Sequence, residues 1–91
     1  MEDNWYELSC IVRNKDGLHG RPAMDVSDFA QTYDGKIEIH YNNQCYDPRS
    51  LIHLLSLGIP FGSQVNLRVE RFEGCERFAD DLRRLIEVEE G

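Results

Sequence analysis

The hydrophobic periodicity of this chain changes repeatedly between two residues and about 3.6 residues, and this alternation restricts the folds that it can adopt. Near the start, Tyr6, Leu8 and Cys10 alternate with polar residues, which is typical of a half-buried strand. The next apolar residues recur at the spacing of one helix face: Val26, Phe29, Ala30 and Tyr33. The change of period therefore predicts a strand followed by a helix over about residues 21–33, which Gly35 is expected to end.

The rest of the chain continues in the same manner. Residues 36–41 and 44–46 are predicted strands, and Asn42-Asn43 between them suits a tight turn because Asn tolerates positive φ. A short helix is predicted to begin at Asp47-Pro48 or slightly later at Ser50, and to end at Gly58. A strand at 65–69 and a helix at 78–86 complete the order β-α-β-β-α-β-α. This order favours an α+β fold in which helices cover one face of an antiparallel or mixed sheet, as a single domain over 1–91.

Composition narrows the classes of function. The 91 residues carry a formal charge of −7, which argues against binding to nucleic acid or to anionic lipid. No apolar run is long enough to insert into a membrane, and the acidic start, Met1 to Asn4, is unlike a secretory signal, so a cytoplasmic protein is expected. The three cysteines, Cys10, Cys45 and Cys75, are odd in number and widely spaced, with no C-x-x-C pair. This pattern predicts buried free thiols and suggests neither a disulfide framework nor a cysteine-rich zinc site.

Residues 17–23, Gly-Leu-His-Gly-Arg-Pro-Ala, are the most informative for chemistry. His19 is predicted to lie just before a helix, where unpaired N–H groups and the helix dipole favour an anion. Gly20 lets the backbone come close to a ligand, and Arg21 has a forked donor array that suits phosphate oxygens. Since an imidazole is also a nucleophile, the residues indicate a phosphorylatable histidine. The alternative interpretation is an ordinary loop histidine that caps the helix.

This loop resembles the active loop of HPr, the histidine-containing phosphocarrier of the bacterial sugar phosphotransferase system, whose signature is G-[LI]-H-A-R-P-A. Gly20 stands where the signature has alanine. A second block, residues 50–59, is similar to the S-[IL]-[ML]-x-[VL]-[ML]-S-L-G-[IV] run of that family, and the interval from His19 to Ser50 also agrees. The resemblance extends from about Leu8 to Glu87 and implies the family fold, an open-faced sandwich with a four-stranded antiparallel sheet and three helices on one face.

The resemblance implies a carrier in a relay and not a stand-alone turnover enzyme. His19 would accept a phosphoryl group that comes from phosphoenolpyruvate through enzyme I, and would pass it to a IIA component. Arg21 would stabilise the phosphate, no metal or cofactor would be needed, and a monomer is expected. Ser50 stands where a serine kinase phosphorylates many relatives and thereby recruits a transcriptional regulator; simple helix capping is the alternative, and both stay open.

The short helix has four apolar residues that cannot all face the core: Leu51, Ile52, Leu54 and Leu55. Part of this apolar surface is expected to be exposed beside His19 and to form, with Gly20, a docking site for partner proteins. The alternative is a fully buried helix. His53 is interpreted as an exposed bystander, and no role is assigned to His40.

The charges near the loop point in two directions. Lys15, Arg21 and Arg49 fall in segments expected around the histidine and would form a small positive site. Asp25 and Asp28 make the first helix acidic where many relatives are basic or neutral, which brings docking to acidic partners into question. A second hypothesis is therefore a regulatory binding module, in catabolite or nitrogen-type control, that docks a regulator through the Leu51–Leu55 helix. A weaker third one, a hydrolase with His19 as general base, has no nucleophile at a recognised spacing.

Overall fold

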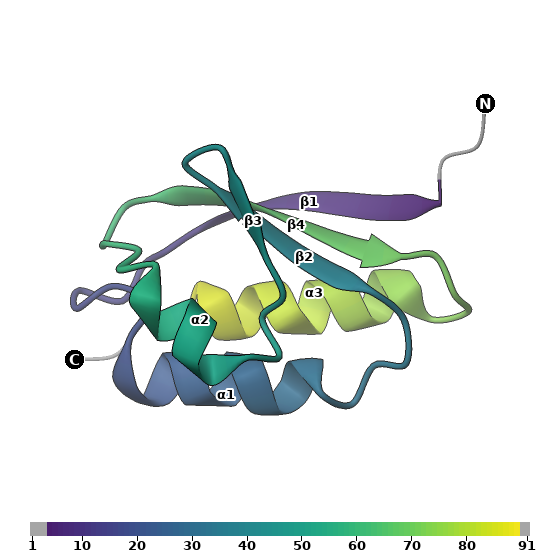
Figure 1. The fold of residues 1–91 in the computed structure, drawn as a ribbon, viewed down its shortest axis with the longest axis horizontal. Helices are drawn as coiled ribbons and strands as arrows, with labels where there is room; N and C mark the ends of the chain where they lie inside the picture. Colours follow the sequence, from purple (N-terminus) through teal and green to yellow (C-terminus); the bar gives the residue numbers. More distant parts are fainter. Residues whose placement is uncertain (1–3, 90–91) are drawn as a thin grey trace.

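A computed structural model describes residues 4–89; residues 1–3, which belong to the acidic start noted above, and 90–91 lie outside the described part. The seven elements follow the predicted order (Figure 1): β1 (Trp5–Ile11), α1 (Gly20–Ala30), β2 (Ile37–Tyr41), β3 (Gln44–Tyr46), α2 (Leu51–Ser56), β4 (Gln64–Glu70) and α3 (Cys75–Ile86).

The four strands form one sheet in the order β1-β4-β2-β3, and every neighbouring pair is antiparallel. The three helices lie on one side of this sheet, whose other face is left without a helix (Figure 1). The predicted open-faced sandwich is thereby confirmed, and the choice between an antiparallel and a mixed sheet is decided in favour of the antiparallel one. The hairpin has the expected turn, since Asn42 and Asn43 have φ values of 54° and 64°.

The core lies between the sheet and the helices because alternate strand residues point toward them. On β4, Val65, Leu67 and Val69 are buried, and on β2 Ile37 and Ile39 are buried. Their neighbours on the same strands face the open side of the sheet. The helices supply the other half of the core with aromatic rings as well as aliphatic side chains: Phe78 of α3 stacks on Phe29 and on Tyr33, with ring centroids 4.8 Å and 4.2 Å apart.

The first helix is shorter than predicted. It ends at Ala30, and the N–H groups of Thr32 and Tyr33 bond to carbonyl oxygens three residues back, so the chain leaves the helix through a tighter turn. Gly35 therefore does not end α1. A Cβ at this residue would lie 2.4 Å from the ring of Phe72, so a larger residue there would have to displace that ring. The short helix α2 likewise ends at Ser56, before Gly58.

The cysteines follow the prediction in part. Cys10 and Cys75 are buried free thiols, as expected, but Cys45 is exposed, so the prediction for it is wrong. The reason is its place on β3, a three-residue edge strand with no buried residue. Among the described residues, no helix is long and apolar enough to cross a bilayer.

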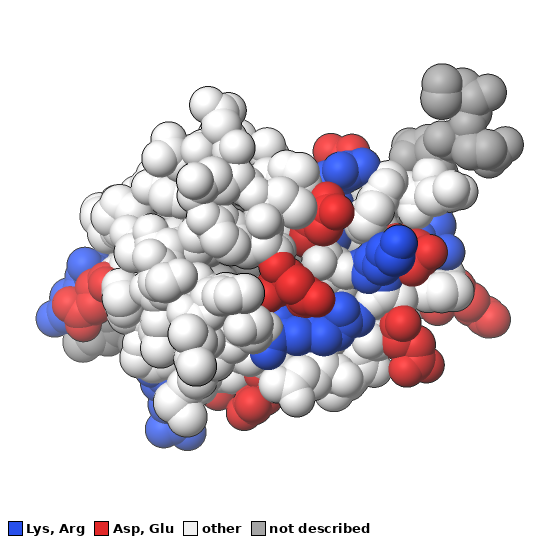
Figure 2. Space-filling view, in the orientation of Figure 1, with Lys and Arg blue, Asp and Glu red and all other residues white. Residues whose placement is uncertain are grey.

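The charged side chains are unevenly distributed over the surface. Figure 2 shows an uncharged surface that extends from the hairpin between β2 and β3 down over α2. Acidic and basic side chains gather to its right, and others border it at the loop before α1 and at the start of α1. The uncharged surface therefore borders the loop that carries His19.

Candidate functional site

His19 is the N-cap residue of α1 and is exposed to solvent. Its backbone is extended, with φ −138° and ψ 171°, which is the usual conformation of an N-cap. Its side chain makes no capping hydrogen bond to the helix. The alternative interpretation of His19, as a capping side chain, is therefore wrong, and the imidazole is available to react with a group outside the protein.

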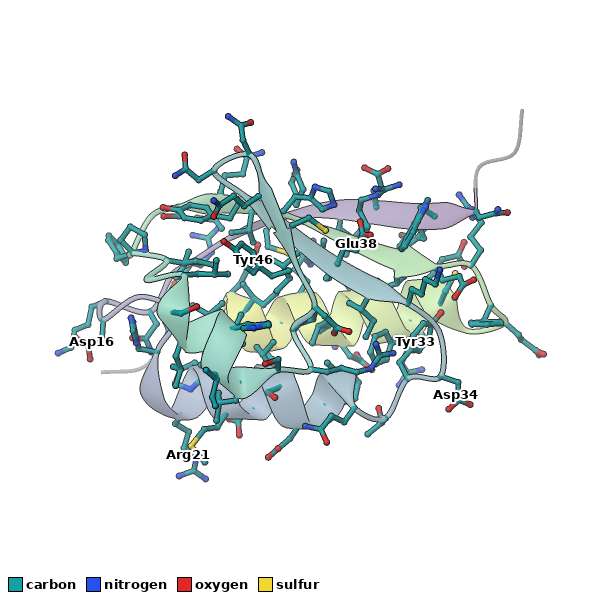
Figure 3. The ribbon with its side chains drawn as sticks, in the orientation of Figure 1. Asp16, Arg21, Tyr33, Asp34, Glu38 and Tyr46 are labelled. Atoms are coloured by element: carbon teal, nitrogen blue, oxygen red, sulfur yellow. The ribbon has the colours of Figure 1, made fainter. Side chains whose placement is uncertain are left out.

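The start of α1 provides donors for an anion. In a helix that begins at Gly20, the N–H groups of Gly20 and Arg21 have no carbonyl partner within the helix, and Pro22 has no N–H group to lose. The positive end of the helix dipole lies at the same place. The Arg21 side chain is exposed and extends from the helix start into solvent (Figure 3), so its guanidinium is free to move toward a phosphate.

The loop that carries His19 is held in place by contacts with the segment after α2. Leu18 is fully buried, and its N–H donates to the carbonyl oxygen of Ile59 at 2.9 Å. Gly17 has a φ of +82°, and a Cβ there would lie 2.4 Å from that same oxygen. The glycine therefore permits the close approach that leaves Leu18 inside and His19 outside.

Gly20 differs from the usual alanine for a visible reason. Its φ is +58°, a left-handed conformation at the first residue of the helix, and no atom lies within 4 Å of the place where a Cβ would be. Space is therefore not limiting at this residue, whereas the backbone conformation is. An alanine at this position would have to tolerate strain or change the way in which the chain enters α1.

Arg49 does not belong to the positive site. Its guanidinium donates to the carbonyl oxygen of Tyr33 at 2.8 Å and to that of Gly35, and pairs with Asp47 at 3.1 Å. These partners lie beyond the far end of α1, away from His19. The prediction for Arg49 is thus wrong, because its side chain is held by carbonyl groups of the segment that joins α1 to β2. Lys15 and Arg21 remain as exposed basic residues of the loop and the helix start.

Ser50 is the N-cap of α2, so of the two predicted helix starts the later one is confirmed. Its Oγ accepts a hydrogen bond from the N–H of His53 at 3.4 Å, and the residue is half-buried. Asp47 caps a turn before the helix instead, since its carboxylate accepts from the N–H of Arg49 at 2.9 Å. The capping role of Ser50 is thus observed, and its hydroxyl still lies near the surface.

The apolar residues of α2 are divided between the core and solvent. Leu54 is fully buried, Leu51 and Leu55 are half-buried, and Ile52 is 79% exposed. The prediction that this helix exposes part of its apolar surface is confirmed, and the fully buried alternative is wrong. His53 is exposed, as predicted.

Two further exposed apolar residues escaped the sequence interpretation. Met24 is 52% exposed and lies one turn along α1 from Gly20 and Arg21. Phe61 is 61% exposed in the loop after Ile59, the residue that holds Leu18. The exposure of Met24 could have been predicted from the helical spacing, which places it on the polar side of the first helix. The exposure of Phe61 could have been predicted from its position between Pro60 and Gly62, which are typical of a turn.

A second cluster of reactive side chains lies away from the loop, on the open face of the sheet. Nε2 of His40 and Oε1 of Glu38 are 2.8 Å apart, and Cys45 is close to both. The hydrogen bond with His40 is the main cause that lowers the pKa of Glu38. The sequence contained the signal for this cluster, because strand alternation places Glu38 and His40 on one face and the hairpin register places Cys45 opposite His40.

Comparison with known proteins gives a consistent result. A family model described as "PTS HPr component phosphorylation site" matches residues 6–87. Among solved structures, the phosphocarrier protein HPr of Bacillus anthracis is similar with a TM-score of 0.84 and 22% identity, covering 93% of this chain and 100% of that one.

Two other solved structures are also similar in fold. HPr-C-His of Thermoanaerobacter tengcongensis has a TM-score of 0.76 and 28% identity, over 87% of this chain and 91% of that chain. Crh of Bacillus subtilis, whose description is catabolite repression HPr, has a TM-score of 0.64 and 22% identity, over 90% of this chain and 96% of its own.

Proposed function

The chain belongs to the HPr family, the phosphocarriers of the phosphotransferase system, and we propose that His19 accepts a phosphoryl group from phospho-enzyme I and passes it to a IIA component. The observation that carries this proposal is the exposed, uncapped imidazole of His19 at the start of α1. The protein acts in this proposal as a monomer in the cytoplasm, and its substrate is a phosphorylated partner protein rather than a small molecule.

The transfer is a nucleophilic substitution at phosphorus. A ring nitrogen of neutral His19 attacks the phosphoryl group of the donor, a new N–P bond forms, and the bond between phosphorus and the donor breaks with its electron pair. Positioning and charge stabilisation are the contributions that a protein makes to such a step. In this proposal the N–H groups of Gly20 and Arg21 donate to the oxygens of a phosphate on His19, and the helix dipole adds to the stabilisation.

The stabilisation that the loop offers is moderate, and this suits a carrier. A solvent-exposed charge at a helix N-terminus gains about 0.3–1 kcal/mol, and Arg21 is itself solvated. A deeply buried phosphate site would hold the phosphoryl group too firmly for the second transfer. The exposed position of His19 also allows two different partners to reach the same nitrogen in turn.

Docking is proposed to use the uncharged surface around the loop. Ile52 on α2, Met24 on α1 and Phe61 after α2 are each more than half exposed, and all three belong to segments next to the loop. The half-buried Leu51 and Leu55 extend this surface along α2, whereas Leu54 belongs to the core. Apolar side chains at the centre with charges at the margin are typical of a protein–protein interface.

A phosphorylation assay tests the carrier function. The full chain is incubated with magnesium, enzyme I of the source organism and phosphoenolpyruvate that carries a labelled phosphoryl group. The labelled phosphate on the protein is then examined for acid lability and alkali stability. We expect stoichiometric label on the wild type, none on His19→Ala, and a slower transfer on Arg21→Gln. His53→Gln is the matched control, because His53 is also exposed but lies on α2. An unlabelled wild type, or label that persists on His19→Ala, would refute the proposal.

A specific observation favours a second candidate, a regulatory module of the same family. Asp28 is exposed and Asp25 half-exposed on α1, next to the proposed docking surface. An acidic patch there repels an acidic partner and slows association. In this candidate, phosphorylation of Ser50 by a serine kinase with ATP controls the binding of a transcriptional regulator, and the phosphate adds about 1.5–2 negative charges beside α2.

The two candidates differ in measurable ways. The regulatory module predicts an acid-stable phosphate at Ser50, lost in Ser50→Ala, together with little or no enzyme I-dependent label at His19. The carrier predicts that Asp28→Lys accelerates labelling of His19 at low salt and that the acceleration fades at high salt. A protein with rapid label at His19 and none at Ser50 is a carrier only.

A further inference from the structure

We propose that Glu38, His40 and Cys45 form a binding site for a Zn²⁺-class metal ion on the open face of the sheet. Their ligand atoms, one carboxylate oxygen, one imidazole nitrogen and one thiol sulfur, all lie within 4.8 Å of one another. The site is separate from the histidine loop: Glu38 lies on the sheet, whereas Asp16 and Arg21 mark the loop and the helix start at the other side of the molecule (Figure 3).

Strand geometry brings these side chains together. Glu38 and His40 are two residues apart on β2, so they point to the same face of the sheet, opposite to the buried Ile37 and Ile39. Cys45 on β3 is directly paired with His40. Side chains that are directly opposite in an antiparallel pair have Cβ atoms about 4.5–5.5 Å apart. The cluster therefore follows from the backbone of a tight hairpin and does not depend on a mobile loop.

The donor set selects the metal. Thiolate and imidazole ligands favour Zn²⁺ and similar ions over Mg²⁺ or Ca²⁺, which require oxygen. With metal–ligand distances of about 2.0–2.3 Å in a tetrahedral site, neighbouring ligand atoms lie about 3.3–3.7 Å apart. To reach this range, Nε2 of His40 and Oε1 of Glu38 have to move apart from their present 2.8 Å, and the three ligand atoms now lie within 4.8 Å of one another. Three protein ligands leave the fourth position to water.

The charge in contact with the cluster is that of Arg68, a cation that an incoming metal ion has to displace from the Glu38 carboxylate. Arg68 contacts Glu38 at 3.2 Å, but it also contacts Glu7 at 3.3 Å and lies over the ring of Trp5 at 4.4 Å. When a metal takes the Glu38 oxygen, Arg68 retains these two partners.

Cys45 is a free thiol, so its coordination forms an S–metal bond and releases the thiol proton to solvent. The metal itself compensates the negative charge that the thiolate would otherwise place beside Glu38 and Asp47.

The cluster is accessible from both sides. Glu38 and Cys45 line a hollow of about 240 Å³, and His40 lines a second hollow of about 410 Å³ with Asn42, Asn43, Gln64 and Asn66. Hydrated ions can therefore reach all three ligands without any opening of the fold. Cys45 is exposed, which leaves its sulfur free to approach the ion.

Metal titration of the full chain tests the site. Co²⁺ is added to the reduced protein, and absorption is followed for thiolate-to-cobalt charge transfer; Zn²⁺ is then added as a competitor. We expect one ion per chain and displacement of Co²⁺ by Zn²⁺. The charge-transfer band should be absent in Cys45→Ser, and affinity should fall at least tenfold in His40→Gln and Glu38→Gln. His19→Ala and His53→Gln are the matched controls, and both should bind as the wild type does.

Two outcomes would overturn the site. One is the absence of a thiolate band in the folded wild type at stoichiometric Co²⁺. The other is unchanged binding in Cys45→Ser, which would move the metal to other residues. A second readout guards against misfolded variants: Zn²⁺ should raise the unfolding temperature of the wild type and not that of Cys45→Ser, while both proteins give the same circular dichroism spectrum. Labelling of His19 is not measured in this test, so failure of the metal site can be distinguished from failure of the carrier function.

Discussion

The N–H of Leu18 donates to the carbonyl oxygen of Ile59 at 2.9 Å, and this one hydrogen bond joins the histidine loop to the segment after α2. The two residues are far apart in the sequence but belong to the two blocks that resemble the HPr family. Leu18 and Ile59 are both fully buried, so the bond is shielded from water. The position of His19 is therefore determined by α2 and its following loop as well as by α1.

Gly17→Ala should destabilise the protein much more than Gly20→Ala does. Both glycines have positive φ, at +82° and +58°, so both substitutions cost about 1–2 kcal/mol of backbone strain. Only at Gly17 does the new Cβ also meet an atom, the Ile59 oxygen at 2.4 Å. We expect a loss of about 2–4 kcal/mol for Gly17→Ala and about 1 kcal/mol for Gly20→Ala, measured by urea unfolding.

The same pair of variants separates loop position from chemistry. Gly17→Ala should also slow labelling of His19, because it displaces Leu18 and with it the imidazole. If the two variants lose equal stability, the contact with Ile59 does not constrain the loop.

The sequence predicted the order of elements and the loop that carries His19 because both depend on local information. Periodicity determines which residues face the core, and glycine and proline mark the ends of the histidine loop. The ends of α1 and α2 were less predictable. Gly35 resembles a helix stop in the sequence, but its role depends on Phe72, a residue that only the tertiary fold brings near.

Ile52 and Leu54 should separate docking from folding. Leu54 is fully buried, so Leu54→Ala should cost about 2–5 kcal/mol of unfolding free energy. Ile52 is 79% exposed, so Ile52→Ser should change stability by less than about 0.5 kcal/mol. If the uncharged surface is the docking site, Ile52→Ser should nevertheless raise the Kd for enzyme I, measured by calorimetry, by about tenfold. An unchanged Kd with unchanged stability would exclude Ile52 from the interface.

Arg49→Lys should weaken the fold and leave the phosphoryl chemistry intact. The guanidinium donates to two backbone carbonyl groups and one carboxylate at once, a geometry that a lysine cannot reproduce. We expect a loss of about 1–2 kcal/mol by urea unfolding, with normal labelling of His19. Arg77→Lys is the control, since its side chain is 86% exposed and has one ion pair at 3.6 Å; its stability should be unchanged. Loss of His19 labelling without loss of stability would mean that Arg49 does take part in the positive site around His19.

The surroundings of the Arg49 and Cys45 side chains could not be predicted from the local sequence. The sequence places Arg49 next to Ser50, but nothing local tells whether its long side chain turns toward His19 or toward the end of α1. Similarly, a cysteine in a predicted strand is expected to be buried, yet β3 is an edge strand whose residues reach solvent. Arg49 is decided by contacts with the segment after α1, and Cys45 by the lack of a second strand beside β3 in the described part of the chain.

Alkaline pH should unfold the protein partly through Cys10. Burial, followed by the charge of Glu87, raises the pKa of the Cys10 thiol from 9.0 to about 12. The folded state therefore keeps this proton at a pH at which the unfolded state has released it. The stabilising contribution of the neutral thiol is complete below pH 9 and is lost as the pH rises toward 12. Between pH 7 and pH 10 this one group should lower the unfolding free energy by about 1.4 kcal/mol.

The comparison with Cys10→Ala isolates that contribution. This variant is less stable at pH 7 because Cys10 is fully buried and the substitution leaves a cavity, but it lacks the titrating thiol. Tyr33, whose pKa is also raised, remains in both proteins and contributes equally. The difference in unfolding free energy between wild type and variant, measured in urea at pH 7, 9 and 10, should therefore shrink as the pH rises. A difference that stays constant would mean that the thiol of Cys10 titrates alike in the folded and unfolded chains.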